Sequence, residues 1–70
     1  MDFKKQFQFK AARAIKGINQ IDAAKLIGVS PSTLSSWENG ETEPMASQFL
    51  RMSVVYGVPL DQLSGQKAFV

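Results

Sequence analysis

The sequence predicts an all-α fold, a compact bundle of five short helices. Apolar side chains recur every three or four residues over most of the chain, and this spacing buries one face of an α-helix. Glycines follow three of the apolar runs, at Gly17, Gly28 and Gly57, where the positive φ open to glycine can end a helix. The periodic runs and their stops therefore divide the chain into short helical segments.

Length and composition indicate one globular domain. The chain has 70 residues, and a domain of this size buries roughly 60% of the surface that its unfolded form exposes. Hydrophobic residues make up 44% and charged residues 20%, which is the composition of a globular protein rather than of a disordered one.

The sequence contains neither cysteine nor histidine, which excludes disulfides and thiolate metal sites. Its acidic residues are scattered over helix ends, so no acid–base pair or metal cluster can be assembled from spacing. No apolar run approaches the roughly 20 residues of a membrane span, and the N-terminus lacks the apolar core of a signal peptide. We expect a soluble cytoplasmic protein that is not an enzyme and binds no cofactor, metal, membrane or small-molecule ligand.

The first helix is expected over about residues 7–16, or from residue 3. Phe9 and Ala12 fall on its inward face at helical spacing. Phe3 and Phe7 are harder to place. They either pad the outside edge of the bundle or form an exposed aromatic patch for a dimer contact or a lipid surface.

Two short helices joined by a tight turn are predicted over residues 20–39. Asn19 is a favourable N-cap, and Asp22 three residues later can complete a capping box. Gly28 ends the first helix, and Ser30 caps the second with Pro31 at its first position. The side chains expected on the inward faces are Ala23, Ala24, Leu26, Ile27, Val29, Leu34 and Trp37. This arrangement is a helix-turn-helix.

The rest of the chain predicts a loop and two more helices. Pro44 disfavours helix in the residue before it, so residues 41–44 form a polar loop. A largely buried fourth helix follows over about residues 47–56, with Phe49, Leu50, Met52, Ser53 and Val54 at helical spacing. A short fifth helix over residues 58–63 is expected to close over the core through Leu60 and Leu63.

These residues resemble the helix-turn-helix domains of the phage repressor and Cro type, often called the Xre family. The resemblance covers about residues 7–64 and leaves an N-terminal extension over 1–6 and a C-terminal tail over 65–70. It implies a bundle of about five helices in which the second and third form the DNA-binding unit. The resemblance rests on Arg13 four residues before Gly17, Asn19-Gln20, Ala24, Gly28, Leu34 and Trp37-Glu38-Asn39-Gly40.

The resemblance also implies roles for particular side chains. The outward face of the third helix would contact base edges and phosphates, because a major groove about 12 Å wide admits one helix. Gln20 and Asn39 would contact the DNA backbone, and Arg13 would form a structural ion pair with Glu38. The expected DNA-binding residues are Gln20, Ser30, Pro31, Ser32, Thr33, Ser35, Ser36 and Asn39.

Charge gives weaker information. The net charge of +2 and the pI near 9.2 point only weakly to a polyanionic partner. The loop after the third helix is often basic in relatives, but here it carries Glu41 and Glu43, which would repel phosphate. Neutralisation must come from cations elsewhere, so each monomer neutralises few phosphates and we expect a homodimer on DNA. The candidate cations are Lys4, Lys5, Lys10, Arg13, Lys16 and Lys25.

Two functions remain open from the sequence. The first is a sequence-specific transcriptional regulator, similar to a repressor or Cro, that binds a double-stranded DNA operator through the major groove, as a dimer. The second is a protein-interaction module, such as an antitoxin or anti-regulator, that uses the same fold with weak DNA binding. The first function is the leading hypothesis, and the acidic loop and the aromatic N-terminus are the features that support the second.

Overall fold

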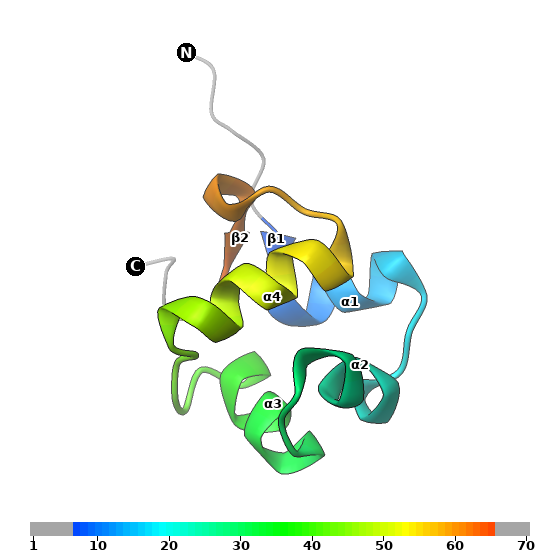
Figure 1. Ribbon diagram of the computed structural model, residues 1–70, viewed down its shortest axis with the longest axis vertical. Coiled ribbons are helices and arrows are strands. Elements are labelled where there is room, and N and C mark those ends of the chain that lie inside the picture. Colours follow the sequence, from blue (N-terminus) through cyan, green and yellow to red (C-terminus); the bar gives the residue numbers. More distant parts are fainter. Residues whose placement is uncertain (1–6, 66–70) are drawn as a thin grey trace.

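The computed structural model describes residues 7–65 (Figure 1). This part of the chain is mostly helical, as predicted, and contains four α-helices and two strands of two residues each. In chain order the elements are β1 (Phe7–Gln8), α1 (Phe9–Lys16), α2 (Gln20–Ile27), α3 (Pro31–Glu38), α4 (Ala46–Tyr56), the 3₁₀ turn η1 (Leu60–Gln62) and β2 (Leu63–Ser64).

The helices are arranged in two levels. Figure 1 shows α2 and α3 together at one end of the molecule, the two strands and η1 at the other, and α1 and α4 between them. Helix α2 contacts both α3 and α4, and α1 contacts α3 and α4. Helices α1 and α4 therefore pack against the helix-turn-helix pair, α2 and α3.

Local sequence signals explain the ends of α2 and α3. The Asn19 side chain accepts a hydrogen bond from the Asp22 backbone N–H at 2.8 Å, and the Ser30 hydroxyl accepts one from the Thr33 N–H at 3.1 Å. Gly28 follows α2 with φ of 92°, a left-handed conformation that side chains with a Cβ rarely adopt. The predicted caps at Asn19 and Ser30 and the tight turn are therefore confirmed, but the predicted capping box is not, because the Asp22 side chain accepts no hydrogen bond from the Asn19 N–H.

The first correction concerns the start of α1. Residues 7 and 8 are not helical but pair in parallel with β2, with Phe7 opposite Leu63 and Gln8 opposite Ser64. Strand pairing satisfies backbone groups of both segments, and its partner lies at the far end of the described chain. Local periodicity carries no signal of such a partner. Phe3 lies outside the described residues.

The second correction concerns residues 58–63, where one 3₁₀ turn replaces the predicted fifth helix. Because Leu63 and Ser64 must be extended to pair with β1, the helix cannot continue through them. Leu63 closes over the core and is 3% exposed, but Leu60 remains 40% exposed. The described part of the chain therefore has four helices and a turn, not five helices.

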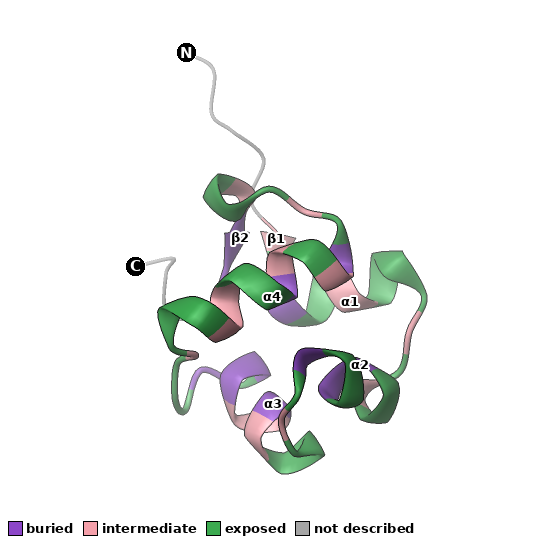
Figure 2. Ribbon diagram, viewed as in Figure 1, coloured by how far each residue is buried: buried purple, intermediate pink, exposed green. Residues whose placement is uncertain are grey.

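The core lies where the four helices and β2 meet, and the buried segments in Figure 2 face this centre. Burial of one large apolar side chain contributes about 1.5–3 kcal/mol. The Phe9 ring also meets the Phe49 ring edge to face, with 6.1 Å between centroids. The buried apolar residues are Phe9, Ala12, Ala23, Ala24, Ile27, Leu34, Trp37, Met52, Tyr56 and Leu63.

Besides Leu60, three more side chains expected inside are exposed. Leu26 is 57% exposed, Leu50 53% and Val54 81%, so the predictions of an inward Leu26 and a largely buried α4 are wrong. Helix α4 packs through Met52 and Tyr56, and Leu50 and Val54 lie one turn apart on its other side. The apolar residues of α4 therefore cover a wider part of its circumference than the face that is buried.

Tyr56 places a polar group in this core. The side chain is 4% exposed, and its hydroxyl has no hydrogen-bond partner within residues 7–65. Burial, assisted by the Glu38 carboxylate, raises the pKa of Tyr56 to about 12 from its ordinary value of 10.0, although Arg13 acts in the opposite direction. The folded protein therefore favours the neutral phenol.

We predict that Leu34→Ala destabilises the protein by about 2–5 kcal/mol, because it leaves a cavity at a fully buried position. Leu26→Ala makes the same chemical change at an exposed position and should cost under about 0.5 kcal/mol. Denaturant unfolding of both variants measures the difference. Equal losses would contradict the burial assigned to these two side chains.

A second prediction uses Tyr56, which is the only tyrosine in the chain. Since its pKa is raised in the folded state, its contribution to stability is complete below about pH 10 and is lost as the pH rises toward about 12. Tyrosinate absorbance should titrate near pH 12 in native protein and near pH 10 in denaturant. Tyr56→Phe should remove this alkaline loss of stability, and a native midpoint near 10 would contradict the burial.

Candidate nucleic-acid interface

Helix α3 separates an apolar side from a hydroxyl-rich side. Leu34 and Trp37 are buried. The opposite side carries Pro31 and Ser32, which are exposed, and three half-buried residues, Thr33, Ser35 and Ser36. In Figure 2 the first residues of α3 are the exposed ones. The helix therefore offers short polar side chains over its first two turns.

Several of these hydroxyls are already bonded at the start of α3. Ser30 Oγ donates to Thr33 Oγ1 at 2.9 Å and lies 3.3 Å from Ser32 Oγ. Because Ser30 uses its only hydrogen on Thr33, the Thr33 hydroxyl hydrogen remains able to donate elsewhere. Ser30 is thus a capping residue first. Ser32 must be the donor in its long contact of 3.3 Å with Ser30, whereas Thr33 keeps a donor that a ligand can use.

At the other end of α3, Asn39 Nδ2 lies 3.5 Å from Ser35 Oγ and donates a long hydrogen bond to it. The Ser36 side chain has no hydrogen bond among the interactions of residues 7–65, and its backbone carbonyl accepts from the Glu41 N–H at 2.9 Å. Ser32 and Ser36 are four residues apart and therefore lie on one side of the helix. Their hydroxyls form the accessible pair on α3.

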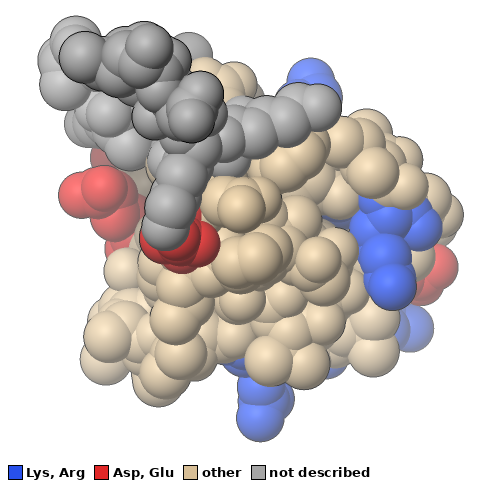
Figure 3. All heavy atoms as spheres, turned by 90° about the horizontal axis from the view of Figure 1, so that it is seen from above, with Lys and Arg blue, Asp and Glu red and all other residues tan. Residues whose placement is uncertain are grey.

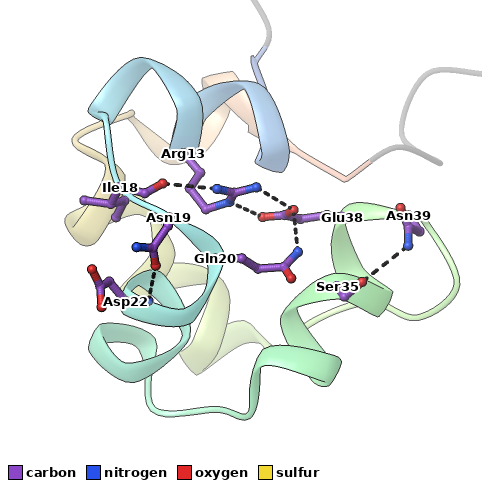
Figure 4. Close-up of polar contacts among 8 residues, drawn as sticks. All are labelled: Arg13, Ile18, Asn19, Gln20, Asp22, Ser35, Glu38 and Asn39. Carbon is purple, nitrogen blue, oxygen red and sulfur yellow. Dashed lines mark hydrogen bonds and ion pairs between the residues drawn. The ribbon is translucent and has the colours of Figure 1, made fainter.

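Arg13 and Glu38 are brought together by α1 and the end of α3 (Figure 4). Arg13 Nε donates to Glu38 Oε2 at 2.7 Å, and Arg13 Nη2 donates to Oε1 at 3.2 Å. The side chains are 14% and 2% exposed. The hydrogen bond to Glu38 raises the Arg13 pKa, so the guanidinium stays protonated.

The same carboxylate also binds α2. Gln20 Nε2 donates to Glu38 Oε1 at 3.0 Å, and Arg13 Nη1 donates to the Ile18 carbonyl at 3.1 Å, just before the cap of α2. Figure 4 shows Gln20 directed toward Glu38 from the start of α2. Sequence reasoning assigned Gln20 a backbone contact with DNA and missed this bond, since no local pattern links residues on different helices.

The predicted site residues therefore fall into two groups. Arg13, Gln20 and Glu38 form one connected cluster, with the exposed Asn39 next to Glu38 in the chain. The second group lies along α3, and among the described residues no side-chain hydrogen bond joins it to Arg13, Gln20 or Glu38, although Asn39 donates to Ser35. Its members are Ser30, Pro31, Ser32, Thr33, Ser35 and Ser36.

Charged side chains are spread thinly over the rest of the surface. Glu41 and Glu43 are exposed in the loop after α3. Arg51 of α4 is a further exposed cation that sequence reasoning left out, and its Nη1 lies 3.6 Å from where a Cβ on Gly28 would be. Figure 3 shows a largely uncharged face over η1, α1 and α4, with separate basic and acidic patches. Lys4 and Lys5 lie outside the described residues.

Three further observations on residues 7–65 concern metal ligands, membrane spans and pockets. These residues contain no cluster of three or more potential metal ligands. None of their helices is long and apolar enough to cross a membrane. A pocket of about 340 Å³ lies beside Phe9, Phe49 and Leu63, with Glu43 as its only acidic lining residue.

Comparison with known families agrees with the geometry. A family model described as helix-turn-helix matches residues 9–63, which include all four helices. Searches of curated proteins and of solved structures give no match. The match covers well over half of the chain, and α2 and α3 are the two helices of the motif. The chain therefore belongs to the helix-turn-helix family of the phage repressor and Cro type, a family of DNA-binding regulators.

Proposed function

We propose that this protein is a sequence-specific transcriptional regulator, similar to a repressor or Cro, that binds a DNA operator through the major groove as a homodimer. The observation that carries this proposal is the hydroxyl-rich outer side of α3, which is presented by a helix whose other side is buried. Membership of the helix-turn-helix family supports DNA as the ligand.

The dimensions and side chains of α3 suit the major groove. An α-helix with its side chains is about 10–12 Å across, close to the width of about 12 Å of the groove that admits one helix. Serine and proline side chains keep the helix backbone close to the base edges. Ser32 and Ser36 would contact bases, with Pro31, Thr33 and Ser35 beside them.

Direct recognition of bases should be modest. Serine and threonine cannot make the bidentate contacts of arginine with guanine or of glutamine with adenine. Water bridges, contacts with thymine methyl groups and sequence-dependent DNA shape would supply more of the specificity. Gln20 and Asn39 would add contacts with phosphates, which fix position but carry no direct sequence information.

The acidic loop favours a dimer on DNA. Exposed Glu41 and Glu43 follow α3 directly, so the positions where relatives often carry cations would weaken binding here. A dimer doubles the number of contacts, and its two α3 helices would enter half-sites about 34 Å apart on one face of the duplex. The operator is then expected to be palindromic.

A second function, a protein-interaction module with weak DNA binding, is favoured by one observation. The exposed side of α4 carries Leu50 and Val54 one turn apart, which is apolar surface that a protein partner would cover. Selection of duplexes from a random library separates the two functions. Enrichment of a palindromic sequence supports the regulator, and failure to enrich any sequence supports the interaction module.

We predict that Ser32→Ala and Ser36→Ala weaken binding to the selected duplex by about 1–3 kcal/mol each, because each removes a contact with a base edge. Binding to random duplexes should change much less. Fluorescence anisotropy measures both. Ser47→Ala on α4 is the matched control at another exposed serine, and equal losses on both duplexes would assign Ser32 and Ser36 to backbone positioning.

Replacing Glu41 and Glu43 with lysine should strengthen binding to any duplex. Each newly neutralised phosphate adds about 0.9 to the slope of log K against log salt, so a salt series should steepen. The pair of glutamine substitutions at the same positions should strengthen binding without steepening the slope as much. Specificity should hardly change. An unchanged slope in the lysine variant would mean that this loop points away from DNA.

A further inference from the structure

We infer that Glu38 is a positioning residue for DNA binding, whose carboxylate holds the Gln20 side-chain amide in the orientation that presents an N–H to a DNA phosphate. This inference rests on the proposed function. It explains why an acidic side chain, Glu38, lies beside a surface that binds DNA. The contact that carries it is the hydrogen bond of 3.0 Å from Gln20 Nε2 to Glu38 Oε1.

The partner decides which end of the amide faces inward. An ionised carboxylate accepts hydrogen bonds and donates none, so the NH₂ end of Gln20 must face Glu38 and the carbonyl end must turn away. Glu38 itself cannot rotate freely, because Arg13 binds both of its oxygens and its side chain is 2% exposed. The Gln20 amide is therefore ordered before any ligand arrives.

One amide hydrogen remains available after this bond, since an NH₂ group has two. Nearby backbone donors are also available. Asn19 accepts from the N–H groups of Asp22 and Ala23 at 2.8 and 3.0 Å. The N–H groups of Gln20 and Ile21 have no acceptor within the helix, as at every helix start. These N–H groups and the second Gln20 amide hydrogen can together donate hydrogen bonds to the oxygens of a phosphate.

Gln20 is better placed than Arg13 to bind a phosphate, because the donors and the charge of Arg13 are already used within the protein. Arg13 already donates from Nε and Nη2 to Glu38 and from Nη1 to the Ile18 carbonyl, and it is mostly buried. Its positive charge balances Glu38, so the carboxylate near the DNA does not act as an unpaired negative charge. The cluster is neutral overall and orients a neutral donor.

The bond also fixes the spacing of two backbone contacts. Glu38 immediately precedes Asn39, the other residue proposed to contact the DNA backbone. By binding Gln20, Glu38 holds the start of α2 at a set distance from the end of α3. These two points lie side by side, joined by the hydrogen bond of 3.0 Å from Gln20 to Glu38, so the same carboxylate sets the orientation and the separation of the contacts.

A double-mutant cycle with a labelled duplex of mixed sequence tests this inference. The set comprises wild type, Gln20→Ala, Glu38→Gln and the double variant. Gln20→Ala should weaken binding about tenfold in the wild-type background, because it removes a hydrogen bond to a charged group. In the Glu38→Gln background the same change should cost less than about twofold, because a carboxamide has only one acceptor oxygen and no longer dictates which end of the Gln20 amide faces inward.

Gln8→Ala is the matched control, since it removes an exposed glutamine amide from β1, at the other end of the molecule from α3 (Figure 1). Thermal unfolding of each variant gives the folded fraction used to correct the affinities. Equal losses on Gln20→Ala in both backgrounds would overturn the inference while leaving the proposed function in place. Failure of wild type to bind any duplex would overturn both.

A measurement on wild type alone covers the case in which Glu38→Gln does not fold. The order parameter of the Gln20 Nε2–H vectors should be close to the rigid value of about 0.85 in DNA-free protein, and that of the exposed Gln8 amide should be much lower. Adding the duplex should shift the Gln20 side-chain resonances. A mobile Gln20 amide in the free protein would overturn the inference.

Discussion

The arrangement of the helices depends on the hydrogen bonds that the buried carboxylate of Glu38 accepts. This carboxylate accepts hydrogen bonds from Arg13 on α1 and Gln20 on α2, and it belongs to the last residue of α3. A buried pair of this kind adds little net stability, because desolvation offsets most of the attraction. Its value lies in geometry, since moving α1 away from the end of α3 while Glu38 stays buried would leave a charge without a partner.

That constraint determines what the outer side of α3 can do. With α2 and α3 fixed, the Ser32 and Ser36 hydroxyls keep a constant relation to the start of α2. Ordering side chains on binding costs free energy, so a surface whose amide and capping hydroxyls are already bonded loses less when it meets DNA. The short side chains of α3 limit the number of direct contacts with DNA. The rigidity of the surface offsets part of the binding free energy that is lost in this way.

Local signals explain why α2, α3 and their turn were predicted well from sequence. Asn19, Ser30 and Gly28 act through bonds within a few residues. The strand pairing of Phe7 with Leu63 joins the two ends of the described chain, and periodicity contains no information about it. The Gln20 bond to Glu38 joins two helices and escaped prediction for the same reason, while the Arg13 pairing was expected only because of a family resemblance.

Thermal unfolding of Glu38→Ala tests the central claim most directly, with Glu41→Ala as the control at an exposed glutamate in the next loop. Removing one partner of a buried pair costs roughly 3–5 kcal/mol. For a domain of this size that lowers the melting temperature by about 10 °C or more, whereas Glu41→Ala should change it by under about 3 °C. Equal melting temperatures for the two variants would contradict the claim that Glu38 holds the helices together.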